Sequence, residues 1–150
     1  MKPVVLGMNN PHSTELDDVL SPRFPGSAGC RLYQMVREVD PSVSEADYHE
    51  QLDRRNLITE RCWSKQRARL AKLAMLDSLR GCRVVLLGTA LPSVLGLRHL
   101  GKWYEWNVDH DRYMRWCVAP HPSGLNRIYN EVEYRNKTGR LLVDLIRSVS

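Results

Sequence analysis

Short uninterrupted runs of apolar residues alternate along the chain with segments in which apolar residues recur every three or four positions. The clearest runs are Val4–Leu6 and Val84–Leu87, the latter within a strand expected at residues 83–87, and residues 114–119 are a further strand candidate. Apolar runs of this length without polar alternation are typical of strands that are buried on both faces of a parallel sheet. A further strand is expected at residues 56–59, where Leu and Ile follow an asparagine.

Helical periodicity fills the intervals between these runs. Leu32, Met35 and Val36 have the spacing of a buried helix face in a segment that begins near Gly29. Ser44 and the acidic residue three positions later form a capping box, which predicts a short helix to about residue 53. Further helices are expected at residues 65–80, 125–134 and 141–146. Alternating strands and helices predict the α/β class, as a single three-layer domain over residues 1–150 with a central, mostly parallel four-stranded sheet flanked by helices.

Size and composition agree with one globular domain. The chain has 150 residues, of which 43% are hydrophobic and 26% are charged, and a chain of this length buries about 70% of its unfolded surface on folding. It contains no apolar run of about 18 residues, so no transmembrane helix is expected. The apolar start is too short for a signal peptide, and we expect a cytoplasmic protein of a bacterium, an archaeon or a virus-infected host.

The cysteines argue against a metal centre. Cys30, Cys62, Cys82 and Cys117 are 32, 20 and 35 positions apart, and no pair has the close spacing of a zinc or iron–sulfur site. We therefore expect reduced thiols, no metal and no other cofactor.

The charge balance is moderately basic. Lys and Arg number 22 against 17 Asp and Glu, which gives a net charge of +5. Such an excess is compatible with a nucleic-acid partner and does not establish one. Seven basic residues lie between Arg54 and Lys72, a cluster that a solvated helix face explains equally well.

Two loops that follow predicted strands carry residues suited to chemistry. Ligands of parallel α/β sheets bind beyond the carboxyl ends of the strands. The first loop begins Gly7-Met8-Asn9-Asn10-Pro11, which taken alone is typical of a turn. The second holds His121 between two prolines, which restrict its backbone, and is followed by Ser123 and amides placed to bind an anion at a helix start.

Together these segments resemble the uracil-DNA glycosylase superfamily. Residues 121–127, His-Pro-Ser-Gly-Leu-Asn-Arg, are similar to the second active-site motif of that superfamily and carry the most specific match. Residues 22–32 resemble its Phe-containing stretch before a helix, and residues 55–58 resemble the strand whose asparagine reads the base. The landmarks run in order from Val4 to about Asn130, which is most of the chain.

The resemblance implies a role for each matching residue on the base side of the site. His121 would stabilise the anionic base as the glycosidic bond breaks. Phe24, the single Phe of the chain, would stack on the flipped base, and Asn56 would read its edge. Met8 would also contact the base. Without the resemblance, Phe24 would be read as a core residue and Asn56 as a turn residue at a strand end.

On the DNA side, the resemblance implies that Ser123 holds a backbone phosphate and that Leu125 wedges into the duplex as the nucleotide leaves. Base flipping costs a few kcal/mol, and a wedge and a phosphate contact would offset this cost. Gly124, Asn126 and Arg127 are expected to contact DNA as well.

The first motif departs from the superfamily pattern, which has one variable residue between the glycine and the catalytic position. Here Met8 and Asn9 both precede Asn10-Pro11. Asn10 matches by its position before the proline and is preferred, and Asn9 matches by its distance from Gly7. Either carboxamide lacks the basicity of an aspartate. Orienting a water molecule suffices if the glycosidic bond breaks before the water attacks.

Three hypotheses follow for the function. The first is a monofunctional, monomeric DNA glycosylase that removes uracil or a related modified pyrimidine. The second is a DNA-binding protein of the same fold that senses a modified base without cleaving it, which the carboxamide in the first motif keeps open. The third is an enzyme that acts on free nucleosides or nucleotides.

Overall fold

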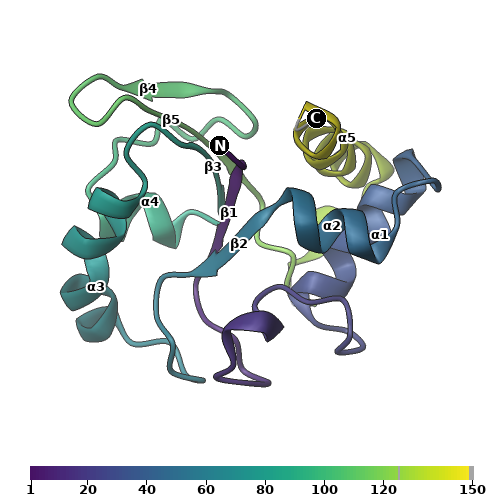
Figure 1. Cartoon of the computed structure of the whole chain (residues 1–150), viewed down its shortest axis with the longest axis horizontal. Coiled ribbons are helices and arrows are strands. Elements are labelled where there is room, and N and C mark those ends of the chain that lie inside the picture. Colours follow the sequence, from purple (N-terminus) through teal and green to yellow (C-terminus); the bar gives the residue numbers. More distant parts are fainter. Residues whose placement is uncertain (125, 149–150) are drawn as a thin grey trace.

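A five-stranded sheet lies at the centre of the computed structural model, which describes residues 1–124 and 126–148 (Figure 1). The strand order is β2-β1-β3-β5-β4, and only the pairing of β4 with β5 is antiparallel. The α/β class with a mostly parallel sheet is thereby confirmed, with five strands where four were expected. The strands are β1 (Val4–Gly7), β2 (Asp53–Asn56), β3 (Arg83–Leu87), β4 (Asn107–Asp109) and β5 (Met114–Ala119).

Helices cover both faces of the sheet (Figure 1). The α-helices are α1 (Ala28–Val39), α2 (Glu45–Gln51), α3 (Lys65–Ser78), α4 (Ala90–Leu95) and α5 (Val132–Ser148), and the short 3-10 helices are η1 (Leu16–Asp18) and η2 (Arg127–Asn130). Helices α1, α2 and α5 pack on one face, and α3 and α4 pack on the other. No helix in the described part of the chain is long and apolar enough to cross a bilayer.

Strand β1 is apolar because both of its faces are buried. Val5 belongs to the hydrophobic core under α1, α2 and α5, whereas Val4 and Leu6 belong to the core under α3 and α4. All three side chains are at most 1% exposed. Because helices cover both sheet faces, neither set of alternating side chains meets water.

Strand β2 lies three residues earlier than the expected strand at residues 56–59. It pairs with β1 in parallel, with Asn56 opposite Gly7, and ends there. Leu57 and Ile58 follow the strand and are buried, at 4% and 3% exposure. Strand β2 lies at the edge of the sheet, where helices cover it less completely. Its side chains are polar and half-buried. Leu57 and Ile58 are therefore core residues that follow the strand, and they are not part of the strand itself.

The carboxyl-terminal segment forms one long helix after a short 3-10 turn, where two separate helices were expected. Gly139 interrupts the apolar pattern but does not break α5. A Cβ atom at this position would lie 2.3 Å from the carbonyl oxygen of Met35 in α1. Only glycine allows the backbones of α1 and α5 to approach this closely.

Two short elements had no clear sequence signal. Helix α4 contains Pro92 in its first turn, a position at which proline is tolerated because its missing N–H has no helical partner there. Strand β4 has three residues and forms an edge hairpin with β5.

Candidate functional site

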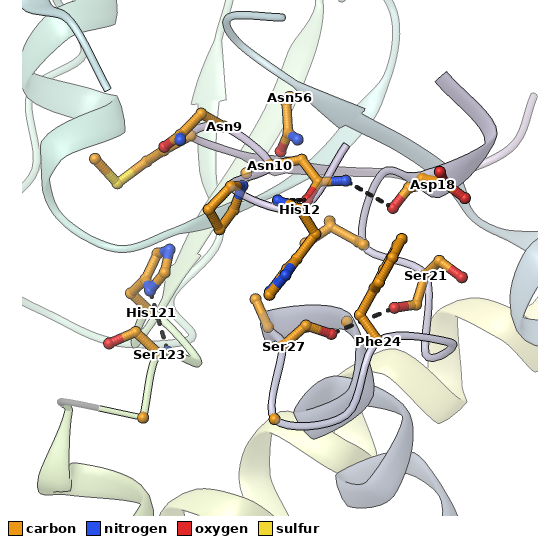
Figure 2. Close-up of a pocket in the computed structure, with 18 of the residues that line it drawn as sticks. Asn9, Asn10, His12, Asp18, Ser21, Phe24, Ser27, Asn56, His121 and Ser123 are labelled. Atoms are coloured by element: carbon orange, nitrogen blue, oxygen red, sulfur yellow. Dashed lines mark hydrogen bonds between the residues drawn. The ribbon is translucent and has the colours of Figure 1, made fainter. Parts of the chain in front are cut away.

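A cavity of about 440 Å³ opens at the carboxyl ends of the parallel strands (Figure 2). Its walls come from the loop after β1, the start of α1, the end of β2 and the loop after β5. The lining residues are Gly7, Met8, Asn9, Asn10, Pro11, His12, Asp18, Leu20, Ser21, Phe24, Gly26, Ser27, Ala28, Gly29, Asn56, Trp63, His121, Ser123 and Gly124.

Most of the residues singled out from the sequence meet in this cavity. They come from segments more than 100 positions apart, and the parallel strands bring them to one edge of the sheet. Asn126 and Arg127 do not line the cavity, and Leu125 lies outside the described residues. The predicted residues in the cavity wall are Met8, Asn9, Asn10, Phe24, Asn56, His121, Ser123 and Gly124.

His121 is fixed in one tautomer by its own loop. Its Nδ1 accepts a hydrogen bond from the backbone N–H of Ser123 at 3.1 Å. A neutral imidazole with an accepting Nδ1 carries its proton on Nε2. Burial lowers the pKa of His121 below its ordinary value, so the neutral form prevails at pH 7. The ring therefore presents an N–H donor, and Nε2 makes no hydrogen bond within the described part of the chain.

Neighbouring contacts hold the backbone of this loop. The side-chain amide of Asn126 donates to the carbonyl of His121 at 2.9 Å, and the hydroxyl of Tyr129 donates to the carbonyl of Pro120. Gly88 at the end of β3 has φ +90°, and a Cβ there would lie 3.1 Å from Cβ of His121. Asn126 thus supports the histidine from within the protein, in addition to the DNA contact expected of it.

Asn56 faces the cavity with an unused acceptor. Its Oδ1 is buried and has no hydrogen-bond partner. A Cβ atom on Gly7, the residue opposite in β1, would lie 2.6 Å from this oxygen, so a larger residue there would displace the Asn56 carboxamide. A buried polar atom without a partner costs about 1–3 kcal/mol. A ligand donor in the cavity would remove this cost.

Asn10 is occupied by the structure of its own loop. Its Nδ2 donates to the carbonyl of Asp18 at 3.1 Å, and its Oδ1 accepts from the backbone N–H of His12 at 2.9 Å. Figure 2 shows the side chain turned toward Asp18. Both ends of this carboxamide therefore stabilise the turn that Pro11 begins.

Asn9 is held at one end only. Its Nδ2 donates to the backbone carbonyl of Arg61 at 2.7 Å, and its Oδ1 has no partner within the described ranges. The Arg61 side chain also binds this loop, because its Nε donates to the carbonyl of Pro11 at 3.0 Å. A carbonyl accepts but never donates, so it dictates which end of the Asn9 carboxamide faces it. The oxygen is left as an acceptor beside the cavity.

An aromatic pair forms a further part of the cavity wall. The rings of His12 and Phe24 are stacked, with centroids 5.1 Å apart and planes within 9° of parallel (Figure 2). The Arg23 guanidinium lies over the Phe24 ring at 4.7 Å and forms an ion pair with Asp18 at 3.4 Å. Phe24 is therefore a wall residue of the cavity and not a core residue.

The residues expected to contact DNA lie at the rim of the cavity or beyond it. The backbone of Ser123 contacts His121, and Gly124 lies against the Arg31 guanidinium, whose Nη2 would be 2.9 Å from a Cβ at that position. Arg127 is exposed at the start of η2.

Several lining residues had escaped the sequence analysis. His12 follows the Asn-Pro motif directly, and its position alone could have suggested it. Trp63 and Asp18 line the cavity because the loops after β2 and β1 fold back over it, a tertiary effect with no local signature. Asp18 is 9% exposed.

The described residues contain no group of three or more metal-ligating side chains. The four cysteines are free; Cys82 and Cys117 are buried, and Cys62 is exposed. Burial raises the pKa of the Cys117 thiol to about 12.

No protein-family model matches the chain, and no curated protein matches it either. What the cavity does must therefore be argued from its own geometry.

Proposed function

We propose that the protein is a DNA glycosylase that hydrolyses the N-glycosidic bond of uracil or a related modified pyrimidine flipped out of DNA. The observation that carries the proposal is the pairing, in one cavity, of a neutral His121 donor with the orphaned acceptor of Asn56. A pyrimidine with a carbonyl oxygen and an N3–H offers the complementary groups. The resemblance of residues 121–127 to the His-Pro-Ser motif supports the same reading.

His121 and Asn56 divide the recognition of the base between them. Nε2–H of His121 donates to the O2 carbonyl, where negative charge develops as the base departs. Oδ1 of Asn56 accepts from N3–H, and its Nδ2 donates to O4. A fixed donor aimed at a developing anion is worth about 10²- to 10³-fold in rate. Cytosine, with an acceptor at N3, would leave the Asn56 oxygen unpaired, so the site discriminates against it.

The reaction has two bond changes. The C1′–N1 bond breaks with its electron pair going to the base, which leaves an oxocarbenium ion on the sugar. Water then adds to C1′ and gives up a proton, which the departed base anion takes up. The products are a free base and an abasic site, and no other reactant is consumed.

Asn9 is the residue that orients this water in the proposal. Its oxygen remains free beside the cavity, whereas both ends of Asn10 are used within the loop. The sequence preference for Asn10 therefore gives way to Asn9, with Arg61 holding the Asn9 amide. An amide oxygen contributes alignment but removes no proton, and the catalysis proposed here rests mainly on departure of the base.

The Asn9 carboxamide also suggests a second candidate function. Without an acid in the first loop, a base-sensing protein that binds DNA and leaves the bond intact would use the same contacts.

A single-turnover assay on oligonucleotides separates these functions. Each oligonucleotide carries one uracil, one mismatched thymine or one hydroxymethylated pyrimidine, and strand scission after alkali reports an abasic site. We expect cleavage by the wild type and by Lys65→Ala, an exposed control at the start of α3, and its loss in His121→Ala. Tight binding without an abasic product would select the base-sensing protein, and turnover of free nucleosides alone would reject both DNA functions.

A further inference from the structure

The stacked pair of His12 and Phe24 determines which aromatic surface the cavity offers to a ligand. Two side chains already contact the Phe24 ring, namely the parallel imidazole of His12 and the guanidinium of Arg23. In the view of Figure 2, His12 lies on the side of Phe24 that faces His121. A ligand reaching from His121 toward Phe24 therefore meets the His12 ring first.

The His12 ring is free to receive such a ligand. The residue is exposed, and the stacking on Phe24 is its one ring contact in the described part of the chain. Its backbone N–H is fixed by Oδ1 of Asn10, which anchors the residue at the cavity. The ring nitrogens make no hydrogen bond within that same part.

The cavity does not need His12 to move. Its volume of about 440 Å³ is present with the imidazole already stacked on Phe24, and both rings belong to its wall. Ligand pockets of about 300–1,000 Å³ accommodate molecules the size of a nucleoside. A planar base can thus enter on the open side of His12.

We propose that the flipped pyrimidine stacks on the imidazole of His12 and that Phe24 acts as the support behind it. This inference rests on the proposed function and changes the residue to which the base-stacking role is assigned. Phe24 becomes a positioning residue, since it holds the His12 ring without touching the base. The ligand class is a planar pyrimidine held between His12 on one face and polar contacts from His121 and Asn56 along its edges.

The test measures the contribution of the base to binding. Kd is determined by fluorescence anisotropy for a duplex with one 2′-fluoro-2′-deoxyuridine, whose fluorine slows bond cleavage, and for the same duplex with a tetrahydrofuran abasic analogue. The ratio of the two Kd values isolates the base contacts from the phosphate contacts. We expect His12→Ala to reduce this preference by roughly 3- to 10-fold and His12→Phe to retain it. His110→Ala, an exposed histidine in the β4–β5 turn, is the matched control and should leave the preference unchanged.

A double-mutant cycle tests the supporting role of Phe24. If Phe24 acts only through His12, Phe24→Ala weakens the preference in the wild type and has no further effect in the His12→Ala background. A tighter fluoro-uridine complex in His12→Ala would overturn the inference, because the imidazole would then occupy the place of the base. So would an equal effect of Phe24→Ala in both backgrounds. Absence of any preference for the fluoro-uridine duplex in the wild type would instead overturn the proposed function, and this inference with it.

Discussion

In the proposed function, the protonation state of the His121 imidazole affects both binding of the base and departure of the base. The Ser123 N–H occupies Nδ1, and burial holds the pKa of the ring below about 6.5. When the ring gains a proton, both nitrogens become donors, and the Ser123 N–H loses its acceptor. The neutral ring is thus the form that fits this loop.

We expect the single-turnover rate to stay constant from pH 8 to pH 6.5 and to fall at lower pH, through the depressed pKa of His121. The unfolded chain binds this proton more readily than the folded chain. Hence the stability that the neutral ring contributes is also lost as pH falls below about 6.5. A pH–rate profile with parallel thermal melts checks both effects. A melting temperature whose inflection lies above pH 6.5 in the wild type and disappears in His121→Ala would contradict the assignment.

The two asparagines of the first loop should respond differently to truncation. Asn9→Ala removes the free oxygen, and we expect the single-turnover rate to fall about 10- to 100-fold while the Kd for DNA is retained. Asn10→Ala removes two loop hydrogen bonds, and we expect a lower melting temperature as its main effect.

Asn136→Ala, on the exposed surface of α5, is the control for both variants. A rate loss in Asn10→Ala that exceeds that in Asn9→Ala, at equal stability, would reverse the two roles.

At the site, the sequence could identify residues that follow a strand and carry distinctive chemistry. His121 was found because the loops after parallel strands gather at one edge of the sheet, whereas Asn56 was named only through the resemblance and had been placed at the start of its strand. Arg61 and Trp63 were not, because their roles arise from a loop that folds back across 50 positions. The choice between Asn9 and Asn10 required the hydrogen bonds that each side chain makes, which spacing does not encode.

At the scale of elements, the packing of α5 on α1 depends on one missing methyl group. Alanine is a better helix former than glycine by about 1 kcal/mol, so Gly139→Ala would stabilise an isolated helix. In the folded chain the new Cβ meets the Met35 carbonyl at 2.3 Å. We expect net destabilisation of about 1–3 kcal/mol, since a backbone atom cannot move aside without displacing α1.

Urea unfolding of Gly139→Ala and of Asn136→Ala, an exposed position in the same helix, provides the comparison. Asn136→Ala should be neutral or slightly stabilising. A Gly139→Ala variant as stable as the wild type would show that the two helices separate at little cost.

The elements that the sequence predicted well are those whose burial is uniform. Apart from Arg83 and the exposed Arg115, strands β1, β3 and β5 are buried because both sheet faces are covered, and the capping box at Ser44 is present as expected. Strand β2 was misplaced because an edge strand with half-buried polar residues has no such signal. The helices expected at residues 125–134 and 141–146 left a gap around Gly139, because its tight contact with α1 comes from a partner about 100 positions away.

At the scale of the whole molecule, the proposed binding to DNA would involve a small footprint, since the net charge is only +5. We expect log Kd to rise with log salt concentration with a slope of about 3 to 4, which corresponds to roughly four phosphates. Arg127→Ala should lower this slope by about 1, because Arg127 is exposed beside the loop of His121.

Arg140→Ala, on the exposed surface of α5, is the control and should leave the slope unchanged. Binding that does not vary between 50 and 300 mM salt (about a sixfold range) would argue against a phosphate-binding rim.

The position of β1 in the sheet has a consequence for synthesis of the chain on the ribosome. Val4 pairs with Asp53 on one side and with Val84 on the other. At about 5–20 residues per second, the first strand emerges roughly 4–16 s before its second neighbour exists. The nascent chain thus carries an apolar strand with at most one partner until more than half of its 150 residues have been made. His121 comes later still, so the proposed base-binding cavity is complete only once most of the polypeptide has been made.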